Sequence, residues 1–200
     1  MNTQNSTITK LAETALMAAL CYVSFTFLQI KIPVPGGDAT SIHIGNAFCV
    51  LAALLIGGVY GGLSGAIGMG IADLMDPVYI TGAPKTFILK FCIGLITGLV
   101  AHKIAKINES TDKKYVFKWS VIASVAGLAF NVVADPIVGY FYKQYILGQP
   151  QELAKMSAVA TLFNAVVSVI LVAVIYNAVR PVLIKSHLLT VTGKKKEQAA

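Results

Sequence analysis

The chain has 200 residues, of which 56% are hydrophobic and 12% are charged, and its formal net charge is +7. Ordinary soluble domains carry about 25% charged residues, so 16 Lys and Arg with 9 Asp and Glu are too few to cover a soluble domain of this size. With a mean hydropathy of +0.73, this composition excludes the soluble class and predicts an integral membrane protein. The three cysteines lie in apolar runs without Cys-x-x-Cys or Cys/His spacing. We interpret them as buried small side chains rather than disulfides or metal ligands.

Six apolar stretches follow one another along the chain. A helix needs about 20 mostly apolar residues to cross a bilayer core, and spanning segments must satisfy their own backbone groups. Because alternating strand patterns are missing, we predict an all-α integral membrane protein with six transmembrane helices, the second and third forming a tight hairpin around Tyr60. The expected spans are residues 11–30, 44–59, 61–74, 86–104, 121–142 and 157–182. They lie in a membrane domain, 11–185, between an N-terminal segment, 1–10, and a basic tail, 186–200.

The distribution of positive charge predicts the orientation of these spans. With six spans, both termini, the second-to-third turn and the fourth-to-fifth loop share one face, which holds 11 of the 16 Lys and Arg residues. The opposite face holds four, and Lys90 lies inside the fourth span. Cytoplasmic loops are enriched in Lys and Arg, so both termini are predicted to be cytoplasmic. Topology thus explains the net charge, and we expect no nucleic-acid partner.

Motifs for nucleotide binding or catalysis are not recognisable in the sequence. The Gly193-Lys194 pair lies in the basic tail without the preceding glycine and strand of a P-loop. HExxH, GxSxG and clustered Cys and His are also missing. We therefore expect no enzyme activity, no metal and no cofactor in this chain. If it moves a solute uphill, the energy comes from an ion gradient or from another subunit.

Polar residues gather in the two outer loops. The first, residues 31–46, contains two prolines and two glycines, which predict an ordered loop. His43 and Asn46 at its end are three apart and share a helical face, so His43 is either a packed cap or a ligand contact. The second loop begins with Asp73 near the end of a glycine-rich span and leads into the fourth span. Ionisable groups at such depths face a cavity or a partner.

Two interpretations of the second loop remain open. Asp73 pairs with Lys85 or Lys90 in a structural salt bridge, or these residues form a polar ligand site. Lys85 alone also suits simple snorkelling to the interface. Aromatic residues that could wall a pocket here are Tyr79, Phe87, Phe130, Tyr140 and Phe163.

The last two spans carry isolated polar residues. Asn131 and Asp135 are four apart on one helical face and are followed by Pro136, and Asn164 lies in the sixth span. Buried carboxylates need partners. We therefore predict a polar pocket near the outer third of these helices, with a helix-to-helix hydrogen bond as the alternative.

Small residues recur at intervals of four, which lets helix backbones approach closely. We interpret the glycines with this spacing as internal packing; they are Gly57, Gly61 and Gly65, Gly58 and Gly62, and Gly94 and Gly98. Ala15 and Ala19 form a similar stripe on the first span. This stripe either packs internally or offers a smooth face to another membrane subunit.

Five segments carry a family resemblance: IPVPGG at 32–37, HIGN at 43–46, LAALLIGG at 51–58, IADL at 71–74 and APKTFILK at 83–90. They resemble the substrate-binding S component of energy-coupling factor (ECF) transporters, in the riboflavin-type branch, whose members are assigned to riboflavin, pyridoxine or hydroxymethylpyrimidine. The stripe at Ala15 and Ala19 fits the family's AxxxA signature. A clear riboflavin-type pocket signature is missing from the fifth and sixth spans.

The resemblance implies six helices with cytoplasmic termini and an outward-opening vitamin site lidded by the first outer loop. It also implies docking through the AxxxA face onto a membrane coupling subunit that carries two ABC-type ATPases, so ATP is used by partners and not by this chain. The expected location is the bacterial cytoplasmic membrane. The candidate substrate-binding residues are His43, Asn46, Asp73, Tyr79, Lys85, Lys90, Asn131, Asp135 and Asn164, and the docking residues are Ala15 and Ala19.

A different class of function competes with this one. The chain could be a self-sufficient ion-coupled carrier with Asp73 or Asp135 as the proton or sodium site. Such carriers are often built from inverted repeats, and a convincing internal repeat is not evident here. A membrane enzyme is a third class, but the sequence offers no nucleophile–base or metal spacing for it.

Overall fold

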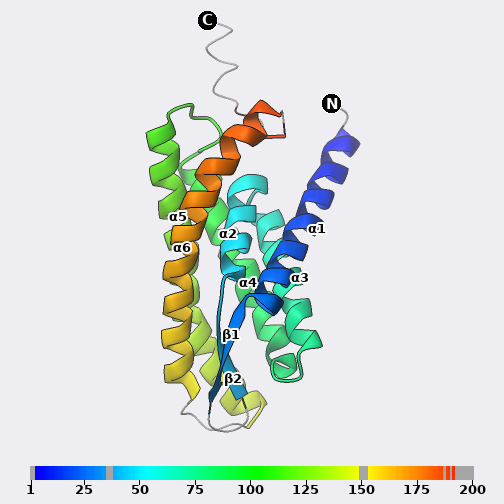
Figure 1. The fold of residues 1–200 in the computed structure, drawn as a ribbon, viewed down its shortest axis with the longest axis vertical. Helices are drawn as coiled ribbons and strands as arrows, with labels where there is room; N and C mark the ends of the chain where they lie inside the picture. Colours follow the sequence, from blue (N-terminus) through cyan, green and yellow to red (C-terminus); the bar gives the residue numbers. More distant parts are fainter. Residues whose placement is uncertain (1–2, 35–37, 149–152, 187, 190, 192–200) are drawn as a thin grey trace, which may run out of the picture.

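The computed structural model describes residues 3–34, 38–148, 153–186, 188, 189 and 191. Six α-helices make up most of it, and α1 begins at the same end of the bundle at which α6 ends (Figure 1). Their bounds are α1 Thr3–Phe27, α2 Gly45–Ile56, α3 Gly58–Met75, α4 Ala83–Gly98, α5 Lys113–Phe141 and α6 Leu153–Lys185. Each contains most of one predicted span. α1 begins at Thr3, so it also includes most of the segment expected before the first span.

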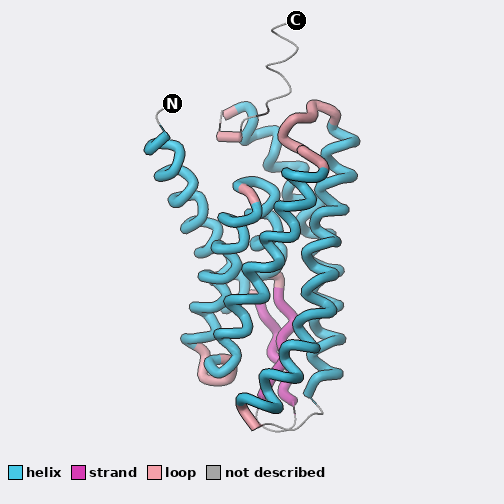
Figure 2. The backbone as a smooth tube through the Cα atoms, turned by 180° about the vertical axis from the view of Figure 1, so that it is seen from behind, coloured by secondary structure: helices cyan, strands magenta, loops and turns pink. Residues whose placement is uncertain are grey.

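A β-hairpin is the feature that the all-helical prediction missed. Strands β1, Gln29–Val34, and β2, Asp38–His43, pair antiparallel, with Gln29 opposite His43 and Ile32 opposite Thr40. The sequence predicted an ordered loop here. The strands run along the half of the bundle away from the start of α1 (Figure 2). Pro33 is tolerated in β1 because a two-stranded sheet has only edge strands. Gly36 and Gly37, expected to shape the turn, lie outside the described residues.

Four stretches in the described part of the chain are long and apolar enough to cross a membrane. They are Thr7–Phe27, Ile80–Ile104, Lys113–Ile146 and Ala158–Lys185. α2 is apolar but has 12 residues, about 18 Å of helix against a bilayer core of about 30 Å. The chain is thus a helical membrane protein, and its six spans and cytoplasmic termini stay predictions.

The α2–α3 hairpin turns at Gly57 rather than at Tyr60, which lies inside α3. Gly57 alone separates the two helices, and its φ of 98° is in the region that favours glycine. The predicted tight hairpin is therefore present, with its turn three residues earlier. The prediction placed the turn wrongly because several glycines in this segment lie within the regular helix.

Most of the repeated glycines pack helices together, as predicted, but Gly57 does not: a Cβ there would meet nothing within 4 Å, and the residue forms the turn instead. A Cβ added at Gly94 would overlap with the backbone of Gly62, and one added at Gly98 would overlap with Gly58. α3 and α4 therefore touch backbone to backbone. All three cysteines are free; Cys21 and Cys49 are fully buried in the core, as expected for small apolar side chains, whereas Cys92 is only partly buried.

Local departures from α-helix lie at the ends of α4 and α5. α4 continues into a π-helical segment, η2 Leu99–Ile104, and α5 into another, η3 Tyr142–Ile146. A 3₁₀ turn, η1 Ile80–Gly82, precedes α4. α5 itself continues through Pro136. η1 and η3 lie at the same end of the molecule as the hairpin, where they help to enclose the site described next.

Candidate functional site

A cavity of about 120 Å³ lies among the hairpin, the α3–α4 connection and the ends of the helices away from the start of α1. All six helices contribute to its walls. Each of the nine candidate binding residues lines it: His43, Asn46, Asp73, Tyr79, Lys85, Lys90, Asn131, Asp135 and Asn164. These residues are up to 121 positions apart in the chain and come together only in the fold.

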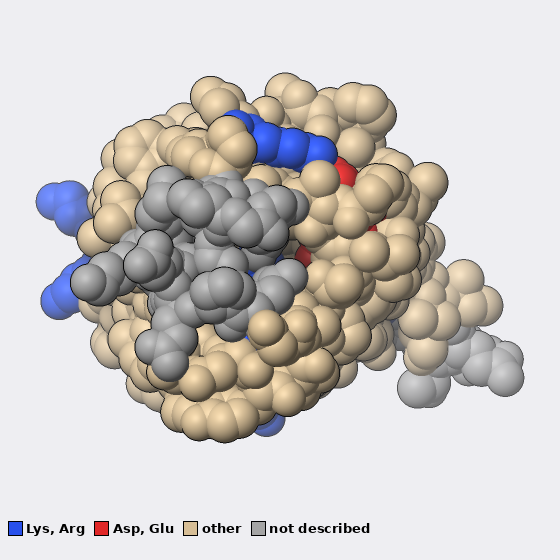
Figure 3. Space-filling view, turned by 90° about the horizontal axis from the view of Figure 1, so that it is seen from below, with Lys and Arg blue, Asp and Glu red and all other residues tan. Residues whose placement is uncertain are grey.

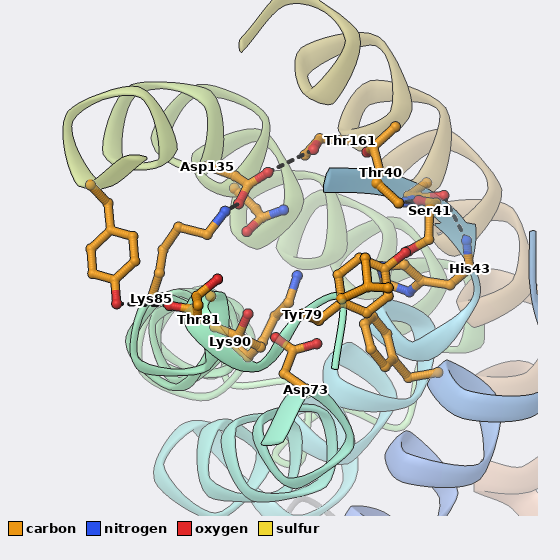
Figure 4. Close-up of a pocket in the computed structure, with 18 of the residues that line it drawn as sticks. Thr40, Ser41, His43, Asp73, Tyr79, Thr81, Lys85, Lys90, Asp135 and Thr161 are labelled. Carbon is orange, nitrogen blue, oxygen red and sulfur yellow. Dashed lines mark hydrogen bonds and ion pairs between the residues drawn. The ribbon is translucent and has the colours of Figure 1, made fainter. Parts of the chain in front are cut away.

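One wall of the cavity is held by an ion pair between helices. Lys85 Nζ of α4 lies 2.7 Å from Asp135 Oδ1 of α5, and the Thr161 hydroxyl of α6 donates to Asp135 Oδ2 at 2.9 Å (Figure 4). Lys85 therefore pairs with Asp135 and not with Asp73, because α4 presents it toward α5. Asp135 joins three helices as well as lining the cavity, so the helix-to-helix alternative describes part of its role.

Asn164 connects α6 to the hairpin. Its Oδ1 accepts from the backbone N–H of His43 at 3.0 Å, and its Nδ2 donates to the carbonyl of Ser41 at 2.9 Å. Both ends of the amide are thus used by the backbone of β2. The His43 ring accepts at Nδ1 from the N–H of Gly45, at 3.2 Å. This bond fixes the ring at the junction of β2 and α2, next to the cavity.

Four buried polar groups in the cavity wall lack strong partners in the described structure. The side chains are exposed by 1% for Asn46, 1% for Asn131, 4% for Asp73 and 8% for Lys90. The Oδ1 atoms of Asn46, Asn131 and Asp73 have no hydrogen-bond donor, and no described carboxylate forms an ion pair with Lys90. Each unsatisfied buried group costs about 1–3 kcal/mol. These four groups would therefore destabilise the fold if their role were only to pack the helices together.

The opposite wall is aromatic. The Phe25 ring of α1 packs edge-on against His43 at 4.6 Å between centroids, and it lies 6.2 Å from the ring of Tyr79. Among the aromatic residues suggested by the sequence, Phe87, Phe130, Tyr140 and Phe163 are not in the cavity wall, and Phe163 is exposed on α6. The sequence did not single out Phe25, because one Phe in an apolar helix carries no distinguishing pattern.

The hairpin is fastened over the site by a charged contact. Lys31 of β1 forms an ion pair with Asp76 after α3, and its ammonium lies 5.2 Å from the centre of the Tyr79 ring. Asp76 Oδ1 also accepts from the N–H of Val78 at 3.0 Å. Partial burial favours protonation of Asp76, but the Lys31 and Val78 bonds prevail and hold its pKa below the usual range. Seen from this end, a basic side chain meets an acidic one on a mostly uncharged surface (Figure 3).

Comparison with known proteins decides the family. Residues 5–181 match the family model described as "ECF-type riboflavin transporter, S component". The chain belongs to this family. The resemblance seen in the sequence is thereby confirmed, and with it the coarser functional statement that this is a substrate-binding subunit for vitamin uptake and not a member of an enzyme family.

One curated relative of this S component comes from Pyrococcus woesei and is described as "Uncharacterized protein in gap 3'region". It is 24% identical over 148 residues, which cover 74% of this chain and 84% of the relative. No solved structure matches the chain.

The predicted docking residues of the S component do not line the cavity. Ala15 and Ala19 are exposed on α1, whereas Ala18 is buried against the rest of the bundle. Large apolar side chains, Leu16 and Leu20, are exposed beside them. The internal-packing alternative for Ala15 and Ala19 therefore does not describe this structure.

Proposed function

We propose that this chain captures a small water-soluble vitamin outside the cell and delivers it as the S component of an ATP-driven ECF-type transporter. The vitamin is riboflavin or a smaller compound such as pyridoxine or hydroxymethylpyrimidine. The chain would span a bacterial cytoplasmic membrane six times with both termini inside. Its partners would be a membrane coupling subunit and two ABC-type ATPases, so the chain itself would need no ATP or other cofactor.

The observation that carries the substrate site is the convergence of nine separately predicted polar residues on one cavity. Ligand sites are concave and place a few polar groups in a mostly enclosed space. Here three residues with unsatisfied buried oxygens, the buried amino group of Lys90 and an aromatic wall surround one cavity. A solute toward which these side chains turn on binding would remove the cost of leaving them unpaired.

The proposed orientation rests on charge and on the arrangement of the ends. The start of α1, the end of α6 and the α4–α5 connection lie at one end of the bundle, and the hairpin and cavity lie toward the other (Figure 1). The Lys-rich segments lie at the first end, which positive-inside topology places in the cytoplasm. Lys194, Lys195 and Lys196 of the basic tail lie outside the described residues. The cavity would then face the exterior.

Cysteine labelling tests this orientation. Single cysteines placed in residues 39–41 should react with a membrane-impermeant reagent added outside intact cells. Cysteines in residues 107–114 should react only after permeabilisation. External labelling of the Lys-rich 103–118 segment would reverse the proposed topology.

Reconstitution tests the function itself. The purified chain in vesicles should bind the vitamin but accumulate it only when the coupling subunit and ATPases are added with ATP. Mass spectrometry of molecules that copurify with the chain would identify the solute. Uptake by the chain alone, driven by a proton or sodium gradient and lost in Asp73→Asn or Asp135→Asn, would instead establish an ion-coupled carrier.

A further inference from the structure

The inner half of the β-hairpin, where β1 leaves α1 and β2 leads into α2, has two chemically different faces. Side chains alternate between the faces of a strand, and residues directly opposite each other share a face. Ile30 is opposite Ile42, so one face is apolar. The other face is polar and lines cavities within the protein, through Gln29, Lys31, Ser41 and His43. The polar face is therefore directed into the molecule, and the apolar face is directed outward.

The apolar face is not covered by the rest of the chain that the structure describes. Ile30 is 67% exposed, whereas a half-buried sheet in water directs its apolar face to the core and its polar face to the solvent. Phe27 and Leu28, which lead from α1 into β1, are also exposed. This arrangement is the reverse of the one expected for a hairpin surrounded by water, and it is the arrangement that contact with lipid favours.

The hairpin fills a gap in the wall of the bundle. α1 and α6 barely contact each other within the described residues, and in one half of the bundle α2 lies between them and contacts both. In the other half β1 contacts α1 and β2 contacts α6, and Figure 1 shows the hairpin in the space between the two helices. Both helices contain stretches long and apolar enough to cross a membrane. The outward face of the hairpin is therefore continuous with the lipid-facing surface of α1 and α6.

Asn164 fixes the depth of the hairpin relative to α6. It bonds to Ser41 and His43 of β2, and it lies six residues after the first residue of the apolar stretch Ala158–Lys185. That stretch has 28 residues and is about 42 Å long, which is about 12 Å more than a bilayer core. When the stretch is centred in the bilayer, Asn164 lies about 9 Å from its start and thus inside the core. The exposed side chains around Asn164 on α6 are apolar: Leu162, Phe163 and Val166.

Backbone groups of the hairpin have partners at this depth, as a segment in lipid requires. On the edge of β2 that faces α6, the Asn164 amide satisfies two of them. β1 runs beside a second cavity of about 330 Å³, which Gln29 and Lys31 line together with Thr26 and Asp76. A polar cavity of this size has room for water, which can bond to the backbone groups of β1 that β2 does not reach.

We infer that the inner half of the hairpin is embedded in the bilayer, where Ile30 and Ile42 contact lipid acyl chains, and that the hairpin separates the candidate site from lipid. α2 alone is too short to cross a bilayer, at about 18 Å. The six residues of β2 add about 20 Å, so strand and helix together complete one crossing. The tip of the hairpin, beyond Thr40, extends toward the solvent. This position in the bilayer does not depend on which solute the cavity binds.

Tryptophan quenching tests the lipid contact directly. Trp119 is the only tryptophan of the chain, so Trp119→Phe provides a background without tryptophan. In that background and in lipid nanodiscs, Ile30→Trp should be quenched by phospholipids brominated on their acyl chains and protected from iodide in solution. Val166→Trp, at an exposed residue of α6, is the lipid-facing reference, and Glu109→Trp, in the α4–α5 connection, is the solvent-facing reference.

The two quenchers distinguish lipid from the other possible surroundings of Ile30. Quenching of Ile30→Trp by iodide and not by brominated lipid would place the hairpin in water and overturn the inference. Protection from both quenchers would mean that a protein surface, such as a second copy of this chain, covers the hairpin, and would also overturn it.

A pair of matched substitutions provides a second measurement that needs no tryptophan. Ile30→Thr and Ile30→Val both keep a β-branched side chain that suits a strand, but only threonine places a hydroxyl group against lipid. In nanodiscs, Ile30→Thr should lower the protection of β1 and β2 against hydrogen exchange several-fold relative to Ile30→Val, because an apolar environment disfavours a polar group. Equal protection in the two variants would contradict the embedding of the hairpin.

Discussion

Asn164 illustrates how a single side chain positions a candidate site without presenting a free group to the ligand. Both polar atoms of its amide bind the β2 backbone, at Ser41 and His43. We predict that Asn164→Leu lowers stability by a few kcal/mol, since two buried backbone groups each lose a partner at about 1–3 kcal/mol. Thermal unfolding in detergent measures this loss.

Asn177→Leu is the matched control in the same helix. Asn177 is exposed and its amide donates only within α6, to Ala173. The Asn177→Leu variant should have the same thermal unfolding transition as the unsubstituted chain. If Asn164→Leu kept full stability but lost vitamin binding, Asn164 would be a direct ligand contact instead of a support for β2.

At the residue scale, sequence reasoning found polar side chains where apolar ones are expected. Asp135 and Lys90 are conspicuous because burying a charge in a membrane helix is costly. Phe25 and Thr161 could not be found in this way, because a phenylalanine or threonine is ordinary in an apolar span. The salt-bridge partner of Lys85 could not be predicted from the sequence either. Whether Lys85 contacts Asp73 or Asp135 depends on how α4 is rotated relative to its neighbours, and residue spacing does not determine that rotation.

The β-hairpin is the element that closes the site, and its charged contact makes it sensitive to acid. The pKa of Asp76 lies below the usual value of 3.8 in the folded state. The contact therefore contributes fully at pH values above 3.8, and this contribution is lost as the pH falls through the lower, folded-state pKa. We predict that the protection of β1 and β2 against hydrogen exchange, after correction for the intrinsic exchange rate at each pH, is a few-fold lower at pH 2–3 than at pH 6, because exposed ion pairs contribute only about 0–1 kcal/mol.

Asp76→Asn is the variant that checks this assignment. It should exchange faster than the unsubstituted chain at pH 6 and show a smaller change between pH 6 and pH 3, after correction for the intrinsic exchange rate. An unchanged exchange profile in the variant would mean that the Lys31–Asp76 contact does not hold the hairpin.

Close contact between α3 and α4 depends on glycine. A methyl group at Gly94 would overlap with the backbone of Gly62, so we predict that Gly94→Ala destabilises the bundle by about 1–3 kcal/mol, the usual cost of overpacking. The measurement is the melting temperature in detergent. Gly82→Ala is the control, since a Cβ there meets nothing within 4 Å and the residue has negative φ. Equal melting temperatures for the two variants would contradict the packing argument.

At the element scale, hydropathy predicted the helices because an apolar run of membrane length has few alternatives to helix. It located each helix to within several residues. It missed β1 and β2 because six-residue strands interrupted by Pro33 look like an ordered loop when only the sequence is read. The turn was predicted at Tyr60 and not at Gly57 for a related reason. Glycines occur both in turns and where helices pack closely, and only the backbone conformation distinguishes the two cases.

At the scale of the whole molecule, the candidate binding cavity and the candidate docking surface lie on different parts of the bundle. The cavity lies toward the hairpin end, while Ala15 and Ala19 lie on the outer surface of α1. Small residues permit close approach of a partner helix in a membrane. Capture of the vitamin and docking to the coupling subunit should therefore be separable by substitution.

Bulky residues on α1 provide the test of this separation. We predict that Ala15→Trp or Ala19→Trp abolishes ATP-dependent uptake in vesicles containing the coupling subunit and ATPases, because the indole keeps the partner helix away. Vitamin affinity of the isolated variant should stay within about twofold of the unsubstituted chain, since neither alanine lines the cavity. Val174→Trp on α6, at a residue that is 66% exposed, controls for added bulk on a lipid-facing surface and should transport normally. Loss of vitamin binding in the α1 variants would mean that these alanines support the fold, whereas normal transport would place the docking surface on another helix.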